Sequence, residues 1–135
     1  MIKFLKFETH QDERGSLISL ESSKNIPFDI KRVYYIFKNG ADVIRGQHAH
    51  KKLKQIYIVV SGSCKVILDD GNKKEIITLD NPDIGMVFDS IIWRELFDFS
   101  QDCVLMVLAD DFYDEEDCIR NYEEFLKYKK KNDRV

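Results

Sequence analysis

Two of the chain's three histidines lie one residue apart, in the stretch VIRGQHAHKKLKQIYIVVSG that runs from residue 43 to residue 62. On a β-strand, residues i and i+2 share a face, so His48 and His50 are predicted to project the same way, together with Gly46. Three kinds of site are then open. The pair could be two ligands of a metal ion, an acid–base pair that acts on a substrate, or two ordinary histidines on a barrel wall.

Without a metal, the chemistry of an imidazole pair is proton transfer. A neutral imidazole, with an ordinary pKa of about 6.5, can take a proton from a carbon that an adjacent ketone makes acidic. The enolate or enediolate oxygen that forms needs a cation or a hydroxyl donor, which an arginine or a tyrosine can supply. If a second acid returns the proton at a neighbouring carbon, the result is the migration of a keto group or an epimerisation.

Short β-type runs separated by turn residues make up most of the chain that must position these histidines. IKFLKF is followed by the turn-like residues 12–15, RVYYIF ends at Asn39-Gly40, and the run that starts at Cys64 folds back at Asp70-Gly71. Many short strands with a turn about every ten residues predict an all-β fold, a closed antiparallel sandwich or barrel.

The C-terminal region changes to a helical period. Ile119, Tyr122 and Leu126 fall near one face of a helix expected over residues 114–131, with acidic residues in its first turn and lysines in its last. No repeat, linker or low-complexity segment divides the chain. We therefore predict one domain over residues 1–135, a β-barrel with a C-terminal α-helix.

Composition narrows the range of partners. A net charge of −3 argues against a nucleic-acid partner, and the longest apolar runs are too short to span a bilayer. The three cysteines are widely spaced and show no C-x-x-C pairing, which argues against a disulfide framework or a zinc knuckle. The N-terminal residues lack the features of a signal peptide. These observations predict a cytoplasmic protein.

The histidine stretch resembles the first motif of the cupin superfamily, and this implies a jelly-roll barrel. The carboxylate that metal-binding cupins supply from this motif is replaced here by Lys54 or Gln55. In the second motif, within DSIIWREL, Arg94 stands where those cupins have a third histidine. A guanidinium is always cationic and has no lone pair for a metal, so we expect no metal and a proton-transfer site.

The whole chain resembles one family of metal-free cupins, the dTDP-4-keto-6-deoxyglucose 3,4-ketoisomerases. The segments that carry this resemblance are ERGSL, IPFDIKRVYYIF, RGQHAHKKLKQ, GSCKVILDDG, WRELFDFS and CVLMVLADDFYDEEDCIRNYEEF. The resemblance implies the exchange of a C4 ketone for a C3 ketone on a dTDP-sugar, without a cofactor. It also implies a role in making 3-amino-3,6-dideoxyhexoses for surface glycans, and a homodimer. Exposed apolar strands such as MVF (residues 86–88) and IKFLKF (residues 2–7) are expected to supply the dimer contact.

The family's catalytic roles transfer to three residues of this chain. By this resemblance, His48 is the base that removes the C3 proton, and His50 is its partner for proton return or orientation. Tyr34 is the candidate hydroxyl donor near the reacting carbons. Strand alternation places Tyr34 and Arg32 on one face of RVYYIF and Tyr35 on the other, so only one of the two tyrosines can face the cavity.

Three arginines are candidate substrate-binding residues. Arg45 is expected to hold the diphosphate, for which bidentate arginine geometry is suited. The resemblance places Arg14 and Arg94 towards the sugar, at positions that vary within the family. Arg14 resembles one subgroup and Arg94 another, so a galacto and a gluco product both stay open.

Three other functions stay open beside the ketoisomerase. A 3,5-epimerase of the same substrate also uses a histidine base but pairs it with a dedicated aspartate, and the sequence shows none beside QHAH. A metal-dependent cupin would contain a stoichiometric metal ion. A non-catalytic module would bind the nucleotide sugar without turning it over.

Overall fold

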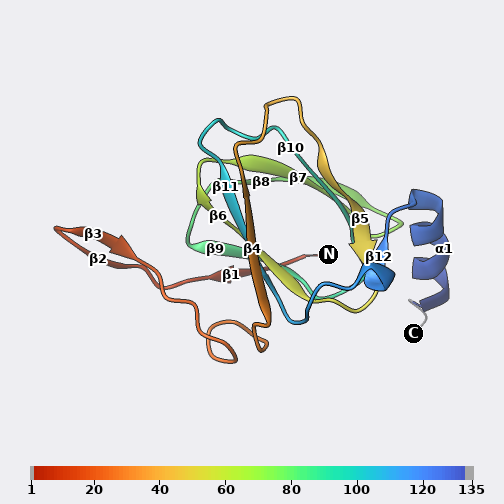
Figure 1. Ribbon diagram of the computed structural model, residues 1–135, viewed down its shortest axis with the longest axis horizontal. Coiled ribbons are helices and arrows are strands. Elements are labelled where there is room, and N and C mark those ends of the chain that lie inside the picture. Colours follow the sequence, from red (N-terminus) through yellow and green to blue (C-terminus); the bar gives the residue numbers. More distant parts are fainter. Residues whose placement is uncertain (1, 133–135) are drawn as a thin grey trace.

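The computed structural model describes residues 2–132, which form two antiparallel five-stranded sheets facing each other across one hydrophobic core (Figure 1). The first sheet contains, in spatial order, β1 (Lys3–Lys6), β9 (Ile84–Phe88), β6 (Gln55–Ser61), β11 (Val104–Ala109) and β4 (Arg32–Phe37). The second contains β12 (Cys118–Ile119), β5 (Arg45–His50), β10 (Trp93–Phe97), β7 (Cys64–Asp69) and β8 (Lys74–Leu79). This arrangement confirms the predicted antiparallel β-barrel of the cupin type.

Strand alternation on β4 decides which tyrosine faces the barrel. Tyr34 packs against the main core, whereas Tyr35 on the opposite face is 62% exposed. The side chains of Val33 and Phe37 share the outer face with Tyr35 and are also more than half exposed. The predicted division of RVYYIF into two faces is therefore confirmed.

A second hydrophobic cluster covers the outer face of the first sheet. Ile26, which is fully buried, lies in the segment between β3 and β4 and packs with Ile58 of β6 and Leu108 of β11. The central strand β6 is consequently buried on both faces from Gln55 to Val59. This burial explains why IYIVV reads as a continuous apolar run rather than an alternating one.

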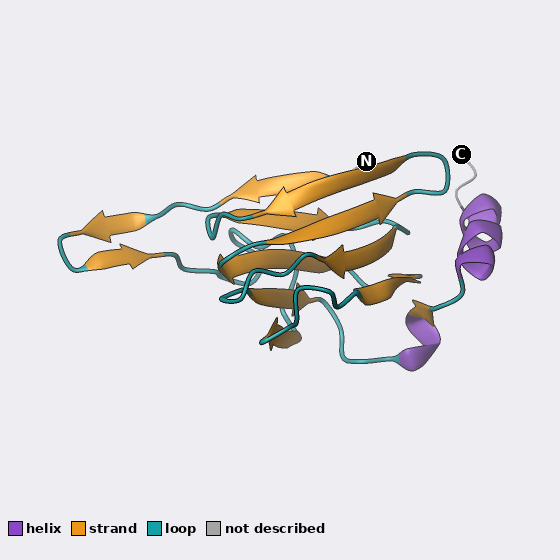
Figure 2. Ribbon diagram, turned by 90° about the horizontal axis from the view of Figure 1, so that it is seen from above, coloured by secondary structure: helices purple, strands orange, loops and turns teal. Residues whose placement is uncertain are grey.

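The hairpin formed by β2 (His10–Asp12) and β3 (Gly15–Leu17) projects from the barrel as an arm (Figure 2). Arg14 lies in its turn, where its guanidinium forms an ion pair with Asp12. His10 is exposed on the same arm. In Figure 1 the arm extends from the side of the barrel opposite β12 and the C-terminal helix.

The C-terminal helix is shorter than predicted. The structure has a 3-10 helix, η1 (Glu115–Asp117), then β12, and only then α1 (Tyr122–Asn132), so the predicted start at residue 114 is wrong. Asp114 caps η1 by accepting from the backbone N–H of Glu116. Ile119, expected on the helix, instead pairs with Ala49 of β5 in the sheet. Backbone pairing with a strand edge thus prevailed over a local helical pattern.

The residues expected to form the dimer contact are only partly exposed. The side chains of Met86, Val87 and Phe88 are at most 5% exposed because β9 lies inside the first sheet, so MVF is not an exposed strand. Phe4 of β1 is 47% exposed. The outer face of β4 presents more apolar surface than either segment. In the part of the chain that the structure describes, no helix is long and apolar enough to cross a membrane.

Candidate active site in the barrel

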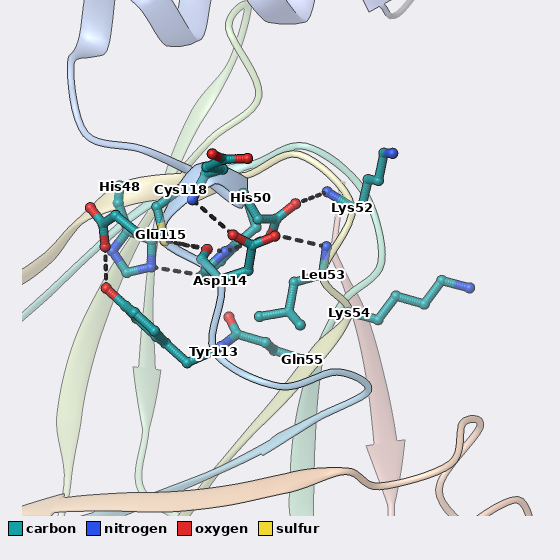
Figure 3. A network of polar contacts seen from close by, with 12 residues as sticks. His48, His50, Lys52, Leu53, Lys54, Gln55, Tyr113, Asp114, Glu115 and Cys118 are labelled. Carbon is teal, nitrogen blue, oxygen red and sulfur yellow. Dashed lines mark hydrogen bonds and ion pairs between the residues drawn. The ribbon is translucent and has the colours of Figure 1, made fainter.

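The two histidines of β5 touch each other. Their side chains project from the same face, and the Nε2 atoms of His48 and His50 lie 3.1 Å apart with the rings nearly perpendicular (Figure 3). This is hydrogen-bond distance, so one Nε2 carries a proton and the other accepts it. The prediction that the pair shares one face of a strand is confirmed.

His50 is also held by a carboxylate from a distant part of the chain. Oδ2 of Asp117 lies 3.1 Å from Nδ1 of His50 and accepts from the backbone N–H of Leu53 at 3.2 Å. Oδ1 of Asp117 accepts from the backbone N–H of Lys52 at 2.8 Å. Sheet pairing brings Asp117 here, because Cys118 of β12 is the direct partner of His50 on β5. The aspartate that the sequence did not reveal beside QHAH is therefore present in the fold.

Both imidazoles are neutral at neutral pH. Burial, followed by the positive charge of Arg94, lowers the pKa of His48 to about 4, although the backbone carbonyl of Gly46 works in the opposite direction. The same two causes, in the same order, lower the pKa of His50 to about 2. A neutral imidazole keeps one lone pair, so the site retains the capacity to accept a proton.

Arg94 is a fully buried cation on β10, directly opposite His48 in the sheet register. Its guanidinium stacks over the ring of Phe88 at 4.1 Å and donates to the side-chain oxygen of Gln55 at 2.7 Å. It also donates to the carbonyl of Ile92 at 3.0 Å. No carboxylate among the described residues forms an ion pair with Arg94. An uncompensated charge inside a protein is costly, and it raises the electrostatic potential of everything around it.

A chain of hydrogen bonds leads from Arg94 to the tyrosine of β4. Because the oxygen of Gln55 accepts from Arg94, its amide nitrogen is left to donate to the hydroxyl oxygen of Tyr34, at 3.3 Å. Burial raises the pKa of Tyr34, and the nearby Tyr57 adds to the effect, so its hydroxyl stays protonated. Tyr34 is thus an acceptor towards Gln55, and its own O–H remains available as a donor.

A cavity of about 240 Å³ reaches His50 from the side of residues 110–118. It is lined by Arg32, His50, Lys52, Leu53, Asp110, Asp111, Phe112, Tyr113, Asp114, Asp117 and Cys118. The guanidinium of Arg32 lies between the rings of Tyr34 and Tyr113, at 5.2 and 5.5 Å from their centroids. The cavity therefore offers cationic side chains within the same space as one of the two imidazoles.

Comparison with known proteins identifies the family to which this arrangement belongs. The family model described as FdtA, WxcM-like C-terminal, matches residues 1–130. The chain belongs to this family. It is 55% identical over 126 residues, 93% of this chain and 91% of the relative, to TDP-4-oxo-6-deoxy-alpha-D-glucose-3,4-oxoisomerase of Aneurinibacillus thermoaerophilus. The resemblance to sugar 3,4-ketoisomerases that the sequence suggested is thereby confirmed.

Two solved structures show the same fold over nearly the whole chain. QdtA, a sugar 3,4-ketoisomerase from Thermoanaerobacterium thermosaccharolyticum in complex with TDP, is 45% identical with a TM-score of 0.94 and covers 96% of this chain and 95% of its own. WlaRB, a TDP-quinovose 3,4-ketoisomerase from Campylobacter jejuni, is 52% identical with a TM-score of 0.89 and covers 93% of this chain and 97% of its own.

The structure groups some of the predicted site residues and separates others. The two histidines are in direct contact, and Tyr34 is linked to Arg94 through Gln55. Arg45 lies on the exposed end of β5, where its guanidinium donates to Asn39 at 3.4 Å. Arg14 lies in the turn of the projecting β2–β3 arm, which Figure 1 shows on the side of the barrel opposite β12.

Two residues at the site went unrecognised as functional candidates in the sequence. Asp117 belongs to the acidic run DEED, which is also typical of a helix N-terminus, and 67 residues separate it from His50. Arg32 lines the cavity. Strand alternation in RVYYIF had already placed it on the same face as Tyr34, and this shared face was the signal in the sequence that could have identified it. No local pattern indicates the pairing of β12 with β5, so no motif in the sequence could have located Asp117.

Proposed function

We propose that the protein is a sugar-nucleotide 3,4-ketoisomerase that converts TDP-4-keto-6-deoxyglucose into a TDP-3-keto-6-deoxyhexose. The observation that carries this proposal is the pair of neutral, hydrogen-bonded imidazoles on β5, next to a permanent positive charge. The names of the relatives point to the same reaction, and a variant of the Thermoanaerobacterium protein has been crystallised with TDP-4-keto-6-deoxyglucose.

In the proposed mechanism, His48 takes the proton from C3 of the sugar, and the electron pair of that bond forms the enediolate between C3 and C4. The O–H of Tyr34 donates to the oxygen that gains negative charge. Return of a proton to the carbon C4 and transfer of the proton of the C3 hydroxyl to the oxygen on C4 then leave a ketone at C3 and a hydroxyl at C4. His50 supports the proton return, and no electron acceptor is needed because the substrate is oxidised at C3 and reduced at C4.

The three predicted arginines receive different roles. Arg94 acts through its charge and through Gln55, because its guanidinium is fully buried. Arg45 is exposed on the strand that carries the histidines and is available to a diphosphate. The cationic Arg32 lines the cavity itself and is a further candidate for that group. Arg14 is proposed to approach the sugar in the site of a second copy, because the β2–β3 arm that carries it extends from the side of the barrel opposite β12 and α1 (Figure 1).

The functional form is proposed to be a homodimer in the cytoplasm. The exposed outer face of β4, with Val33, Tyr35 and Phe37, is an apolar patch on an edge strand of the sheet, and such edges are normally covered. The thiols of all three cysteines are free, which is consistent with a reducing compartment. Sedimentation equilibrium of the wild type and of Tyr35→Glu tests the dimer, and two monomeric proteins would refute it.

The test of the activity is product analysis by NMR in deuterated water. With TDP-4-keto-6-deoxyglucose as substrate, we expect the carbonyl signal to move from C4 to C3, and C4 to gain a hydrogen that is either the one removed from C3 or deuterium from the solvent. The configuration at C4 of the product distinguishes galacto from gluco. His48→Asn is expected to fold and to lose nearly all turnover. Binding of the sugar nucleotide without movement of the ketone and without exchange of its hydrogens would instead identify a binding module.

A 3,5-epimerase is the second candidate, and one observation favours it. Asp117 supplies a histidine with the carboxylate partner whose absence from the sequence argued against this reaction. The same NMR experiment separates the two reactions. An epimerase exchanges the hydrogens at C3 and C5 and keeps its ketone at C4, whereas the ketoisomerase moves the ketone and leaves C5 unchanged.

A further inference from the structure

We propose that Asp117 is a positioning residue that fixes the tautomers of both imidazoles and leaves the free lone pair on Nδ1 of His48. The proposal rests on the proposed function for its catalytic consequence. The tautomers themselves follow from the contacts of Asp117, His50 and His48, and they can be measured without any substrate.

The first step concerns the carboxylate. Asp117 lines the cavity with a side chain only 14% exposed, and two backbone N–H groups donate to it. An ionised carboxylate accepts hydrogen bonds and donates none. The 3.1 Å contact between Asp117 and His50 therefore requires a proton on Nδ1 of His50.

The second step passes this constraint from one ring to the other. His50 is neutral, so a proton on Nδ1 leaves its Nε2 with a lone pair. The 3.1 Å contact with Nε2 of His48 can then be a hydrogen bond only if Nε2 of His48 carries the proton. The charge on Asp117 thus determines the protonation of an atom that it does not touch.

The third step gives the position of the base. A neutral His48 with its proton on Nε2 has its lone pair on Nδ1. This atom is buried and makes no hydrogen bond with any described residue, although the backbone carbonyl of Gly46 is near enough to the ring to favour its protonated form. An unpaired polar atom in a buried place is uncommon and is often connected with function. We assign Nδ1 of His48 as the atom that accepts the C3 proton.

The same chain of contacts also spreads the charge that catalysis creates. When Nδ1 of His48 accepts a proton, the ring becomes an imidazolium, and its Nε2–H already points at the lone pair of His50. Transfer of that proton to His50 moves the positive charge next to the carboxylate of Asp117. No atom is gained or lost in this step. The reverse transfer restores the proton on Nε2 of His48, and the proton that Nδ1 accepted from C3 can then pass from Nδ1 to C4.

A purely structural role is the competing explanation, because Asp117 also holds the loop at residues 52 and 53. Asp70 provides a matched control. Its carboxylate likewise accepts from two backbone N–H groups, of Asn72 and Lys73, but in the hairpin between β7 and β8. Asp117→Asn and Asp70→Asn therefore remove comparable backbone interactions, and only the first changes a group that contacts a histidine.

The experiment is long-range ¹H–¹⁵N NMR of the three histidines at neutral pH, combined with steady-state kinetics. In the wild type we expect a proton on Nδ1 of His50 and on Nε2 of His48, with the exposed His10 as an internal reference. In Asp117→Asn the neutral amide can donate to His50 as well as accept from it, so we expect the reversed tautomers of both rings to become populated. We expect kcat to fall at least about 100-fold with KM changed less than about threefold, whereas Asp70→Asn retains the wild-type kcat.

Each result decides the proposal. Wild-type protein with the proton of His50 on Nε2 overturns it, even if Asp117→Asn fails to fold. Unchanged tautomers in a folded Asp117→Asn, or a kcat equal to that of Asp70→Asn, also overturn it. If the wild type shows the expected tautomers but does not convert TDP-4-keto-6-deoxyglucose, the proposed function fails and the assignment of the tautomers stands.

Discussion

Acidification is expected to destabilise the protein through the histidine pair. The pKa of His48 is lowered to about 4 and that of His50 to about 2, whereas both are about 6.5 in the unfolded chain. Below a pH of about 6.5 the unfolded state therefore binds more protons than the folded state, and the free energy of unfolding falls as the pH drops. The loss contributed by His48 levels off near pH 4, and that contributed by His50 near pH 2.

The magnitude follows from linkage. Between pH 7 and pH 5 each histidine lowers the free energy of unfolding by roughly 2 kcal/mol, and the two together by about 4 kcal/mol. This is a large fraction of the stability of a small domain, which is typically about 5–15 kcal/mol. Carboxylates titrate over the same interval, so the wild type alone does not isolate the effect.

The assay is urea unfolding at both pH values, followed by the fluorescence of the single tryptophan, Trp93, which is 6% exposed. Protein concentration is held constant, because association would also shift the apparent stability. His48→Asn and His50→Asn should each reduce the difference between pH 7 and pH 5 by roughly 2 kcal/mol. His10→Asn, on the exposed arm, should leave the difference unchanged.

The opposite result would refute the reasoning. If both variants at the pair showed the same loss between the two pH values as the wild type, the imidazoles would be protonated or well hydrated in the folded protein. A base of that kind would be at least partly charged near neutral pH, and the tautomer argument would lose its starting point.

Three further predictions concern the surroundings of the pair. Arg94→Met should raise the pKa of both histidines, because the charge of Arg94 is the second largest cause of their lowered pKa values, whereas Arg94→Lys keeps the charge and should not raise them. An NMR titration of the imidazoles measures this, and unchanged pKa values in Arg94→Met would contradict it. Tyr34→Phe should lower kcat about 10- to 100-fold, because the proposed donor to the substrate oxygen is removed. Stability should change little, since the hydroxyl accepts only one long hydrogen bond, and a kcat equal to that of the wild type would exclude the hydroxyl as donor. Phe125→Ala should lower the free energy of unfolding by about 3–5 kcal/mol, because this side chain is fully buried against Trp93 and Ile119. Urea unfolding measures the change, and a decrease under about 1 kcal/mol would show that α1 does not stabilise the barrel.

Short-range signals in the sequence, such as turn residues and strand alternation, predicted part of the fold correctly. The Asp70-Gly71 turn does join β7 to β8, and alternation on β4 placed Tyr34 inside. The start of the C-terminal helix could not be predicted, because Ile119 has both a helical neighbour pattern and an open strand edge available on β5. Pairing between distant segments decided which of the two formed.

The same distinction applies to the site. The pair His48 and His50 could be found because strand geometry alone puts residues i and i+2 on one face. Asp117 is brought to His50 by a two-residue strand, and no spacing rule connects residues so far apart in the chain. The burial of MVF was missed for a related reason, since only the position of β9 within the sheet shows that both of its faces are covered.

The two-residue strand β12 makes the C-terminal helix an anchor for the acid–base centre. Asp117 precedes β12 directly, and α1 begins three residues after Ile119 and is fastened to the barrel by Phe125. Anything that pulls α1 away, such as a bulky fusion or a truncation into the helix, would let the carboxylate drift from His50 before the barrel itself opened. Preparations altered at this end could therefore be well folded and nevertheless inactive.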